Sequence, residues 1–490
     1  MLTGSCCHVA QVTPIDVLPD DVLLAYSDHI EIEYLSEIFD FYVVRISLLQ
    51  RLKRDVELWQ SLVHVCRRWR CVVFGSPRRL NLRLVCTPGT PARERLDVWL
   101  ALPLVIESIP NIFSTSADNI VAPGHSDRIC RIDIQITDDL EWDILLAAMQ
   151  MPFPALTHFL LRCDDIPEPA IPDTFFGGSA PRLQYLRIEG IPFPGIPKLL
   201  LNVTRLVHLY LRKIPDAGYI SPEAMSTCLS VLTSLNTLYL GFQLYSRSPP
   251  VRESRRPPPI TRTTLPDLIS FRFKGASEYL DHLVARIDTP RLQDLSMNFP
   301  PRMNFDTPNL VHFISRTPKF QEPNEARVRF GCHAKVQLFW AFDRFRSLCM
   351  KISCEEVATH LPSFAQACTM CLPPLSTATV EILRLGDFVG SKYRDPYPTF
   401  FWKYDVEEDH WLEVLRPFTA VKSLCLSEEL HLNIAFALQE LVGGRMTEVL
   451  PSLQGIFLDT FEPPGSFQEV IEQFVTARQL SGHPIAVLPL

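Results

Sequence analysis

Glycine is scarce in this chain, which holds 19 Gly among 490 residues, or about 4% against an average of about 7%. Basic residues are outnumbered too: 47 Lys and Arg stand against 55 Asp and Glu, for a formal net charge of −8, so no global basic field attracts nucleic acid or an anionic membrane. The sequence also lacks a basic start followed by an apolar run, and any apolar stretch of the roughly 18 residues that a spanning helix needs. We therefore expect a cytoplasmic or nuclear protein without a nucleic-acid or membrane partner.

The short motifs with a defined chemistry are missing as well: the sequence has no GxGxxG, Walker phosphate loop, GxSxG or HExxH. Cys368 and Cys371 form a single CxxC pair, with His360 eight residues before it, a pattern more typical of buried thiols than of a zinc site. Asp138 and Glu141 have the spacing of a capping box at a helix start. We predict no catalytic residue, no metal and no cofactor, and hence a protein that is not an enzyme.

Proline, by contrast, is abundant, with 42 residues, or about 9% against an average of about 5%. Disordered proline-rich chains lose their apolar residues, but this chain is 47% hydrophobic and holds 30 Phe, which are globular values. Its 14 Cys are scattered among apolar runs, as in proteins of a reducing compartment. The length allows one elongated domain or two to three compact ones, and the prolines are expected between packed elements.

The N-terminal part predicts a small helical module over residues 16–76, after a disordered segment over residues 1–15. Asp16 is a candidate N-cap, and Pro19 suits the first turn of a helix. A second helix is indicated by apolar residues on one stripe at i, i+3, i+4 spacing: Leu58, Leu62, Val65, Cys66, Trp69 and Val73. Residues 75–77, Gly-Ser-Pro, end it. The module is too short to bury its apolar face alone.

Three segments of this module resemble the F-box: Leu18-Pro19-Asp20-Asp21, then Glu37-Ile38-Phe39-Asp40-Phe41-Tyr42, then Val65-Cys66-Arg67-Arg68-Trp69-Arg70. The run over residues 73–84 looks like the segment that follows the F-box in its fungal, mushroom-type family. The resemblance implies three helices that dock on a Skp-type adaptor, which bridges to a cullin ubiquitin ligase. The matching, adaptor-binding positions are Leu18, Pro19, Ile38, Val65, Cys66 and Trp69. The alternative is a helical hairpin that packs on the rest of this chain.

One segment departs from the family pattern, because residues 25–36 (AYSDHIEIEYLS) separate two motifs that the family joins directly. Twelve residues leave a continuous helix about 120° out of phase, so the insert must loop out or adaptor binding is impaired. We expect deletion of residues 25–36 to strengthen capture of the adaptor, and equal or weaker capture would contradict this.

Residues 129–490 are predicted to form an irregular leucine-rich-repeat-like α/β solenoid, joined to the helical module by a connecting segment and first strand over residues 77–128. One short sequence motif, with apolar residues at its first, fourth and sixth positions, recurs at irregular spacing. Its first positions are Ile129, Leu156, Leu183, Leu206, Leu235, Leu268, Leu292, Leu310, Phe345, Val380, Val421 and Leu453. Six copies carry Pro two residues earlier, at Pro154, Pro181, Pro266, Pro290, Pro308 and Pro451. A helix does not continue through such a Pro, so each marks a turn from helix into strand.

Helix-like stretches lie between the copies of this motif, for example over residues 141–150, 222–232 and 278–287. The alternation of short strand and helix is typical of a solenoid whose units bury their faces by stacking, and it resembles the degenerate leucine-rich repeats found behind fungal F-boxes. The Asn ladder of regular repeats is missing, and the pattern is loose after about residue 320. A compact α/β enzyme domain is the rival architecture. Residues 246–264, rich in Pro and Arg, are predicted to be a loop insertion, either solvated or a basic regulatory site.

The residues between the apolar positions of each strand would form a concave face. This face predicts a binding site for an acidic or phosphorylated protein segment, because Arg pairs with carboxylate and phosphate and aromatic residues anchor interfaces. The candidate positions are Tyr185, Arg187, His208, Tyr210, Arg212, Tyr239, Arg272 and Lys274, with Arg131, His158 and Arg162 in the same columns. The alternative is a solvated sheet face, since Glu189, Asp294 and Ser296 dilute the pattern.

The sequence as a whole favours a substrate-recognition subunit of an SCF-type cullin ubiquitin ligase, in which the F-box-like module holds the adaptor and the solenoid holds a target protein. Tethering the target beside the ligase would make ubiquitin transfer effectively intramolecular. The first alternative is an interaction scaffold outside any ligase, and the second is an α/β enzyme. The identity of the target is not encoded in divergent repeats.

Overall fold

The structure is a computed structural model, and it divides into two units, Met1–Asp133 and Ile134–Leu490, which we describe separately. The described residues are 83–87, 102–107, 125–136, 139–163, 170–243, 262–300, 306–330, 333–341, 343–353, 365–366, 368, 377–387, 408–427, 430–441, 445, 447–458 and 465–489. The F-box-like module, with Leu18, Pro19, Ile38, Val65, Cys66 and Trp69, and its insert over residues 25–36 lie outside them. The adaptor-binding role of these residues stays a prediction.

The first unit contains short parallel strands. Strand β1 (Leu84–Cys86) pairs with β2 (Leu104–Glu107), which pairs with the start of β3 (Ile129–Ile136). Leu84, Leu104 and Ile106 are buried. The guanidinium of Arg128 donates to the carbonyl oxygen of Leu102 at 2.7 Å, which secures the segment that enters β3.

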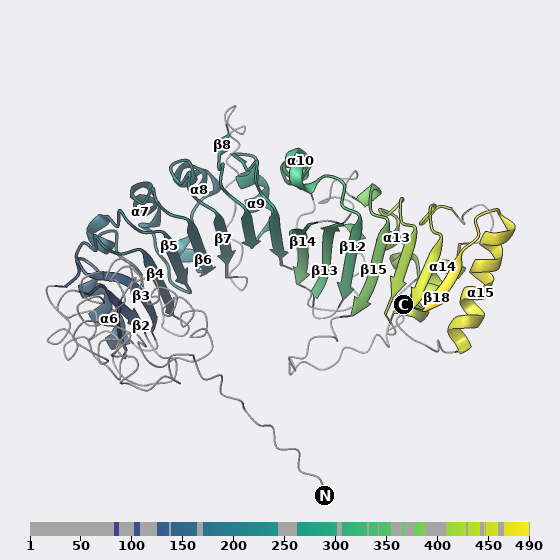
Figure 1. Ribbon diagram of the computed structural model, residues 1–490, viewed down its shortest axis with the longest axis horizontal. Coiled ribbons are helices and arrows are strands. Elements are labelled where there is room, and N and C mark those ends of the chain that lie inside the picture. Colours follow the sequence, from purple (N-terminus) through teal and green to yellow (C-terminus); the bar gives the residue numbers. More distant parts are fainter. Residues whose placement is uncertain are drawn as a thin grey trace, which may run out of the picture. The chain divides into compact units, whose positions relative to one another are not determined.

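The first part of the second unit is a run of parallel strands that pair in chain order, with a helix between most of them (Figure 1). The strands are β4 (His158–Cys163), β5 (Tyr185–Glu189), β6 (His208–Ile214), β7 (Thr237–Phe242), β9 (Ser270–Lys274) and β11 (Asp294–Phe299). The helices are α6 (Asp139–Ala148), α7 (Ile196–Asn202), α8 (Pro222–Leu229), α9 (Ser277–Val284) and α10 (Pro308–Arg316), with short 3-10 turns η2 (Phe175–Gly178), η3 (Asp216–Gly218) and η4 (Pro318–Phe320). Doubly wound sheets reverse their strand order, whereas sequential pairing is the order of a stacked array.

The recurring Pro occupies a defined position in a turn that precedes the strands. In the segment from Phe153 to Leu156, the N–H of Leu156 donates to the carbonyl oxygen of Phe153 at 3.2 Å, so that Pro154 is the second residue of the turn. The same bond closes the turns that contain Pro181, Pro266, Pro290 and Pro451. The fixed φ of Pro suits this position. All five turns lead into a strand, as predicted, but the turns at Pro266 and Pro290 follow short strands over Thr263–Thr264 and Ile287–Asp288 and not a helix.

The prediction is wrong for the sixth Pro, Pro308. Pro308 begins helix α10, and the apolar residue that follows it, Leu310, lies in that helix and not in a strand. Pro is favoured in the first turn of a helix because its missing N–H has no partner there in any case. The same residue type therefore opens a helix at 308 and a turn elsewhere.

Each new strand is set in register at its first residues. The N–H groups of Val207 and His208 both donate to the carbonyl oxygen of Gln184, at 2.8 and 2.9 Å. Those of Asn236 and Thr237 donate in the same way to Val207. The pattern recurs from repeat to repeat, for example from Lys422 and Ser423 to Glu381, so neighbouring strands start level with one another.

The looseness predicted after residue 320 has a specific form, an antiparallel insert of three strands. Strands β12 (Glu325–Phe330), β13 (His333–Trp340) and β14 (Asp343–Ser353) form a meander, in which β14 pairs parallel with β11 and β12 pairs parallel with β15 (Ile382–Asp387). The motif that begins at Phe345 was expected in a strand–helix repeat. It lies instead in β14, which follows the hairpin of β12 and β13. Apolar and polar residues alternate over residues 325–330 and 333–338, as is typical of half-buried strands.

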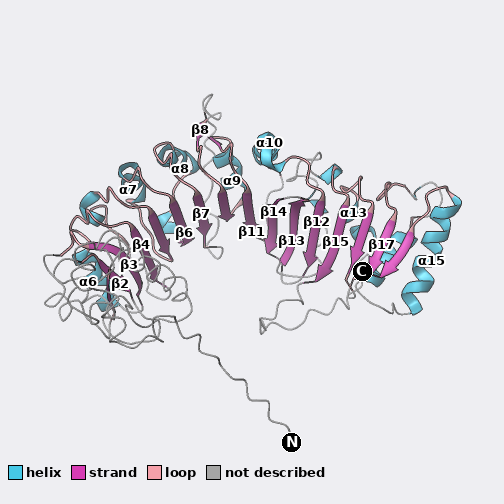
Figure 2. Cartoon of the chain, viewed as in Figure 1, coloured by secondary structure: helices cyan, strands magenta, loops and turns pink. Residues whose placement is uncertain are grey.

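Parallel pairing resumes after the insert. Strands β15, β16 (Ser423–Leu426), β17 (Gly455–Leu458) and β18 (Ala486–Pro489) follow in order, with helices α13 (Glu408–Leu415), α14 (His431–Gln439) and α15 (Gly465–Leu480) between them. The predicted mixed α/β class with a large parallel sheet is confirmed (Figure 2). No helix in the described part of the chain is both long and apolar enough to cross a membrane.

The core of the second unit lies between the sheet and its helices. Alternate strand residues such as Leu209, Leu238 and Phe271 are fully buried, together with Leu280 and Leu283 of α9. The intervening residues are partly exposed on the other side of the sheet, which we call the open face. The predicted loop over residues 246–264 needs one correction: Thr263 and Thr264 form strand β8, which pairs with β10 (Ile287–Asp288), while residues 246–261 lie outside the described part.

Candidate functional site

The open face carries all eight of the predicted target-binding residues. Strand register places them in level rows: Tyr185 lies beside His208, Arg187 beside Tyr210, and Tyr210 beside Tyr239. Tyr239 lies beside Arg272, and Lys274 lies two residues further along the same strand, beside Gly241. Because paired residues of adjacent strands lie about 5 Å apart, the eight residues form one continuous surface over β5 to β9. Arg131 belongs to β3 and is paired with Glu107 at 3.8 Å and Asp133 at 3.5 Å.

Aromatic rings line this surface in a row that we call the aromatic ladder, made of His158, Tyr185, Tyr210 and Tyr239. Ring centroids are 5.8 Å apart for His158 and Tyr185, 5.3 Å for Tyr185 and Tyr210, and 6.4 Å for Tyr210 and Tyr239. The guanidinium of Arg212 lies 4.7 Å from the ring centre of Tyr239, which is cation–π distance. Because neighbouring rings already restrict one another, they would lose little side-chain entropy when a partner binds. Anchor residues of protein interfaces share this property.

The arginines beside the ladder share one carboxylate, that of Glu189. Glu189 binds Nη2 of Arg187 at 2.6 Å, and it lies 3.7 Å from Arg212 and 3.6 Å from Lys213. Burial raises the pKa of Glu189, but the hydrogen bond from Arg187 and the charges of Arg187, Arg212 and Lys213 outweigh it, so the pKa lies below its ordinary value. Glu189 therefore holds Arg187 and Arg212 in place, and because one carboxylate faces three cations, the cluster keeps a net positive charge.

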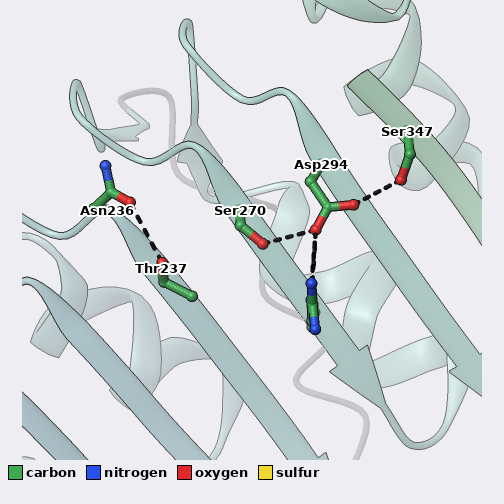
Figure 3. A network of polar contacts seen from close by, with 6 residues as sticks. Asn236, Thr237, Ser270, Asp294 and Ser347 are labelled. Atoms are coloured by element: carbon green, nitrogen blue, oxygen red, sulfur yellow. Dashed lines mark hydrogen bonds and ion pairs between the residues drawn. The ribbon is translucent and has the colours of Figure 1, made fainter. Parts of the chain in front are cut away.

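A second carboxylate joins three neighbouring strands, β9, β11 and β14 (Figure 3). Asp294 of β11 accepts hydrogen bonds from the hydroxyl groups of Ser270 on β9 at 2.8 Å and Ser347 on β14 at 2.7 Å. Arg272 also donates to it, at 3.4 Å. In the same view Thr237 donates to the side-chain oxygen of Asn236 at 3.4 Å. Asp294 thus connects the last parallel repeat to the antiparallel insert and neutralises Arg272.

Further basic residues continue the open face onto the insert, where sequence reasoning missed them. Arg327 and Arg329 of β12, Lys335 of β13 and Lys351 of β14 all point away from the buried apolar residues of their strands. The available signal was the alternation of residues 325–330 and 333–338, in which basic or polar residues separate buried Ala326, Val328, Ala334 and Val336. Their addition extends the candidate surface beyond Lys274.

The predicted CxxC pair is described only in part. Cys368 is buried, while Cys371 and His360 lie outside the described residues. Over the described ranges, no group of three or more His, Cys, Asp or Glu could hold a metal ion. Of the carboxylates near residue 140, Asp139 begins α6, and Asp138 is not among the described residues.

Comparison with known proteins adds little to this geometry. No family model matches the chain, and no curated protein matches it. Among solved structures, the chain is similar to the crystal structure of the leucine-rich repeat-containing protein LegL7 from Legionella pneumophila, with a TM-score of 0.26 and 12% identity over 82% of this chain and 98% of that one. We therefore base the repeat architecture on the register and burial of this chain's own strands.

Proposed function

We propose that this chain is a protein-interaction scaffold whose open face binds a partner protein. The observation that carries the proposal is the aromatic ladder, which presents half-buried rings over four adjacent strands beside the ion pairs of Glu189. Aromatic and Arg side chains dominate the binding energy of protein interfaces. A row of such anchors on a rigid sheet fits a protein partner better than a small molecule, which takes a concave and mostly apolar pocket.

We further propose that the partner is a target for ubiquitin transfer, and that the chain acts as a substrate-recognition subunit of an SCF-type ligase and is not itself an enzyme. The support is the F-box-like sequence, with Leu18, Pro19 and Ile38 in its first motifs and Val65, Cys66 and Trp69 in its last. A Skp-type adaptor and a cullin would then be its assembly partners. A scaffold outside any ligase is the alternative.

Affinity capture with the full chain, followed by mass spectrometry, tests the role of the open face. The variant Tyr185→Ala/Tyr210→Ala/Tyr239→Ala should reduce capture of the partner at least about tenfold, since anchors of this kind contribute more than about 1 kcal/mol each. The matched control is Met151→Ala/Leu201→Ala/Phe436→Ala, which removes three apolar side chains that are 42–44% exposed outside the open face. Equal loss in both variants, or in neither, would refute the proposal.

The ligase role is tested separately in the same experiment. Val65→Ala/Trp69→Ala should remove the adaptor and cullin from the captured proteins while the target is retained. If the target is captured through the open face but adaptor and cullin are missing from the unmodified chain as well, the scaffold alternative is correct. Deletion of residues 25–36 should increase the amount of adaptor.

A further inference from the structure

A row of basic side chains crosses the open face where the antiparallel insert meets the parallel repeats. We call it the basic row: Lys274 of β9, Lys351 of β14, Lys335 of β13 and Arg329 of β12. Lys351 pairs in register with Lys335, and Lys335 with Arg329. Asn298 of β11 lies between Lys274 and Lys351. The insert thus brings basic residues from distant parts of the chain onto adjacent strands.

The carboxylates of the open face do not neutralise this row. Within the part of the chain that the structure describes, none of its four basic residues forms an ion pair, whereas Arg187, Arg272, Arg327 and Arg384 on the same face each do. Asp294 and Glu325, the acidic residues on β11 and β12, lie four residues before Asn298 and Arg329 and are engaged with Arg272, Arg327 and Arg384. The positive charge of the basic row is therefore left for a ligand.

The arrangement is unfavourable without a ligand. Like charges directly opposite on neighbouring strands destabilise a sheet, and here two such pairs adjoin, Lys351 with Lys335 and Lys335 with Arg329. Burial lowers the pKa of Lys335, and the charges of Lys351, Arg329 and Arg327 lower it further. A local conflict of this kind is typical of functional sites.

We propose that the basic row binds a phosphorylated segment of the partner protein, with the phosphate group held by Lys351, Lys335 and Arg329. The proposal rests on the proposed function, the binding of a partner protein at the open face, and adds that the partner is phosphorylated. Three cations on adjacent strands, about 5 Å apart, match a group with three acceptor oxygens and nearly two negative charges. A nucleic-acid strand fits less well, because the chain carries a net charge of −8 and Asp294 and Glu325 precede the row on its own strands.

Binding of defined probes to the full chain tests this assignment. The probes are a fluorescent peptide pool with one fixed phosphoserine between acidic residues, the same pool with serine, and a single-stranded RNA decamer. Fluorescence anisotropy should show at least about tenfold tighter binding of the phosphoserine pool than of the serine pool. Equal binding of the two pools, or absence of binding by both, overturns the proposal, and so does tighter binding of the RNA.

Two double variants locate the site. Lys335→Gln/Lys351→Gln should abolish the preference for the phosphoserine pool without lowering the melting temperature, because the substitutions relieve repulsion. Lys198→Gln/Arg205→Gln removes two exposed positive charges at and beyond α7 and should leave the preference unchanged. A preference that survives the first variant, or is lost in both, contradicts the assignment.

Capture of the partner from lysate separates this inference from the proposed function. Treatment of the lysate with a protein phosphatase should abolish capture, as should Lys335→Gln/Lys351→Gln. Capture that survives both treatments but is lost with Tyr185→Ala/Tyr210→Ala/Tyr239→Ala overturns the phosphate site and leaves the scaffold function in place. Capture that the tyrosine variant leaves unchanged refutes the scaffold function on this face.

Discussion

Some side chains of the open face stabilise the sheet, and others are available to bind a partner. Glu189 stabilises the sheet. It is the shared partner of Arg187, Arg212 and Lys213. Its side chain is only 13% exposed, so its removal leaves half-buried positive charge without compensation. Arg187 and Arg212 lie on the open face as predicted from the sequence, whereas Glu189, which was expected only to dilute the pattern, is the acidic partner of both.

Glu189→Gln should lower the free energy of unfolding by about 1–3 kcal/mol at pH 7. The folded-state pKa of Glu189 is depressed, so its contribution is present above the ordinary carboxyl pKa and disappears as the pH falls through the folded-state value. The difference between wild type and variant should therefore shrink from pH 7 to pH 3 in urea unfolding. Glu381→Gln, which breaks the exposed pair with Lys422, is the control and should cost less than about 1 kcal/mol. If Glu381→Gln lowered the free energy of unfolding more than Glu189→Gln, Glu189 would not have the stabilising role described here.

At the scale of helices and strands, buried polar groups connect neighbouring repeats. Asp281 of α9 is only 6% exposed, and it accepts hydrogen bonds from the backbone N–H of Leu310 at 2.9 Å and from the side chain of Asn309 at 2.7 Å. Both donors lie in the first turn of α10, whose free N–H groups and positive dipole end favour a carboxylate. One helix thus supplies the cap of the next.

Asp281→Ala should reduce the free energy of unfolding by about 1–3 kcal/mol, because it leaves a buried N–H group of α10 unsatisfied. Chemical denaturation of the full chain measures the loss. Asp267→Ala serves as the comparison, since Asp267 is half-exposed and pairs with exposed Arg291, and its effect should stay below about 1 kcal/mol. Similar effects of the two substitutions would rule out the proposed cap.

The insert should also make stability depend on pH through His333 of β13. Burial and the charges of Lys351 and Lys335 lower the pKa of His333 to about 4, so the folded protein keeps the ring neutral while the unfolded chain protonates near pH 6.5. Stability is therefore lost as the pH falls from about 6.5 to about 4. His333→Gln should reduce this loss in denaturation at pH 7, 5.5 and 4, and His312→Gln, on the exposed side of α10, should not. An identical pH profile for wild type and His333→Gln would contradict the shift.

The strands of the parallel repeats could be predicted because their signals are local. Turn prolines such as Pro181 and Pro290, and the apolar residues that follow them, act within a few residues of each strand. The insert has an equally clear alternation, yet its place in the sheet depends on pairing between β14 and β11, whose residues are some 50 positions apart. Such pairing is not encoded in local periodicity, and the basic row that it creates could not be predicted either.

At the scale of the second unit, two blocks of parallel repeats flank the insert, and each strand contacts mainly its neighbours. In arrays of this kind, stability is a sum of local units and their interfaces. The predicted solenoid is consistent with this behaviour, and the loose repeat pattern after about residue 320 indicated where the series is interrupted, although not that an antiparallel insert stands there. We therefore expect the described repeats of the second unit to unfold as coupled segments more than as one cooperative core.

Leu238→Ala should show this segmentation directly. Leu238 of β7 is fully buried, and its truncation should destabilise its surroundings by about 2–5 kcal/mol. Hydrogen exchange should accelerate in β6, β7 and β9 but stay unchanged in β16 and β17, across the insert. Leu424→Ala in β16, also fully buried, should give the reverse pattern. Uniform acceleration over both blocks in either variant would show a single cooperative unit.

The paired N–H groups at each strand entry have a consequence for tolerance to insertions. The intervals from Leu183 to Leu206, Leu206 to Leu235 and Leu235 to Leu268 are 23, 29 and 33 residues long, although β5, β6, β7 and β9 pair level with one another. Two residues per repeat define the alignment, so the length of the chain between them is free to vary. We therefore expect a peptide inserted between Gln243 and Arg262 to leave the pairing of β7 with β9 unchanged.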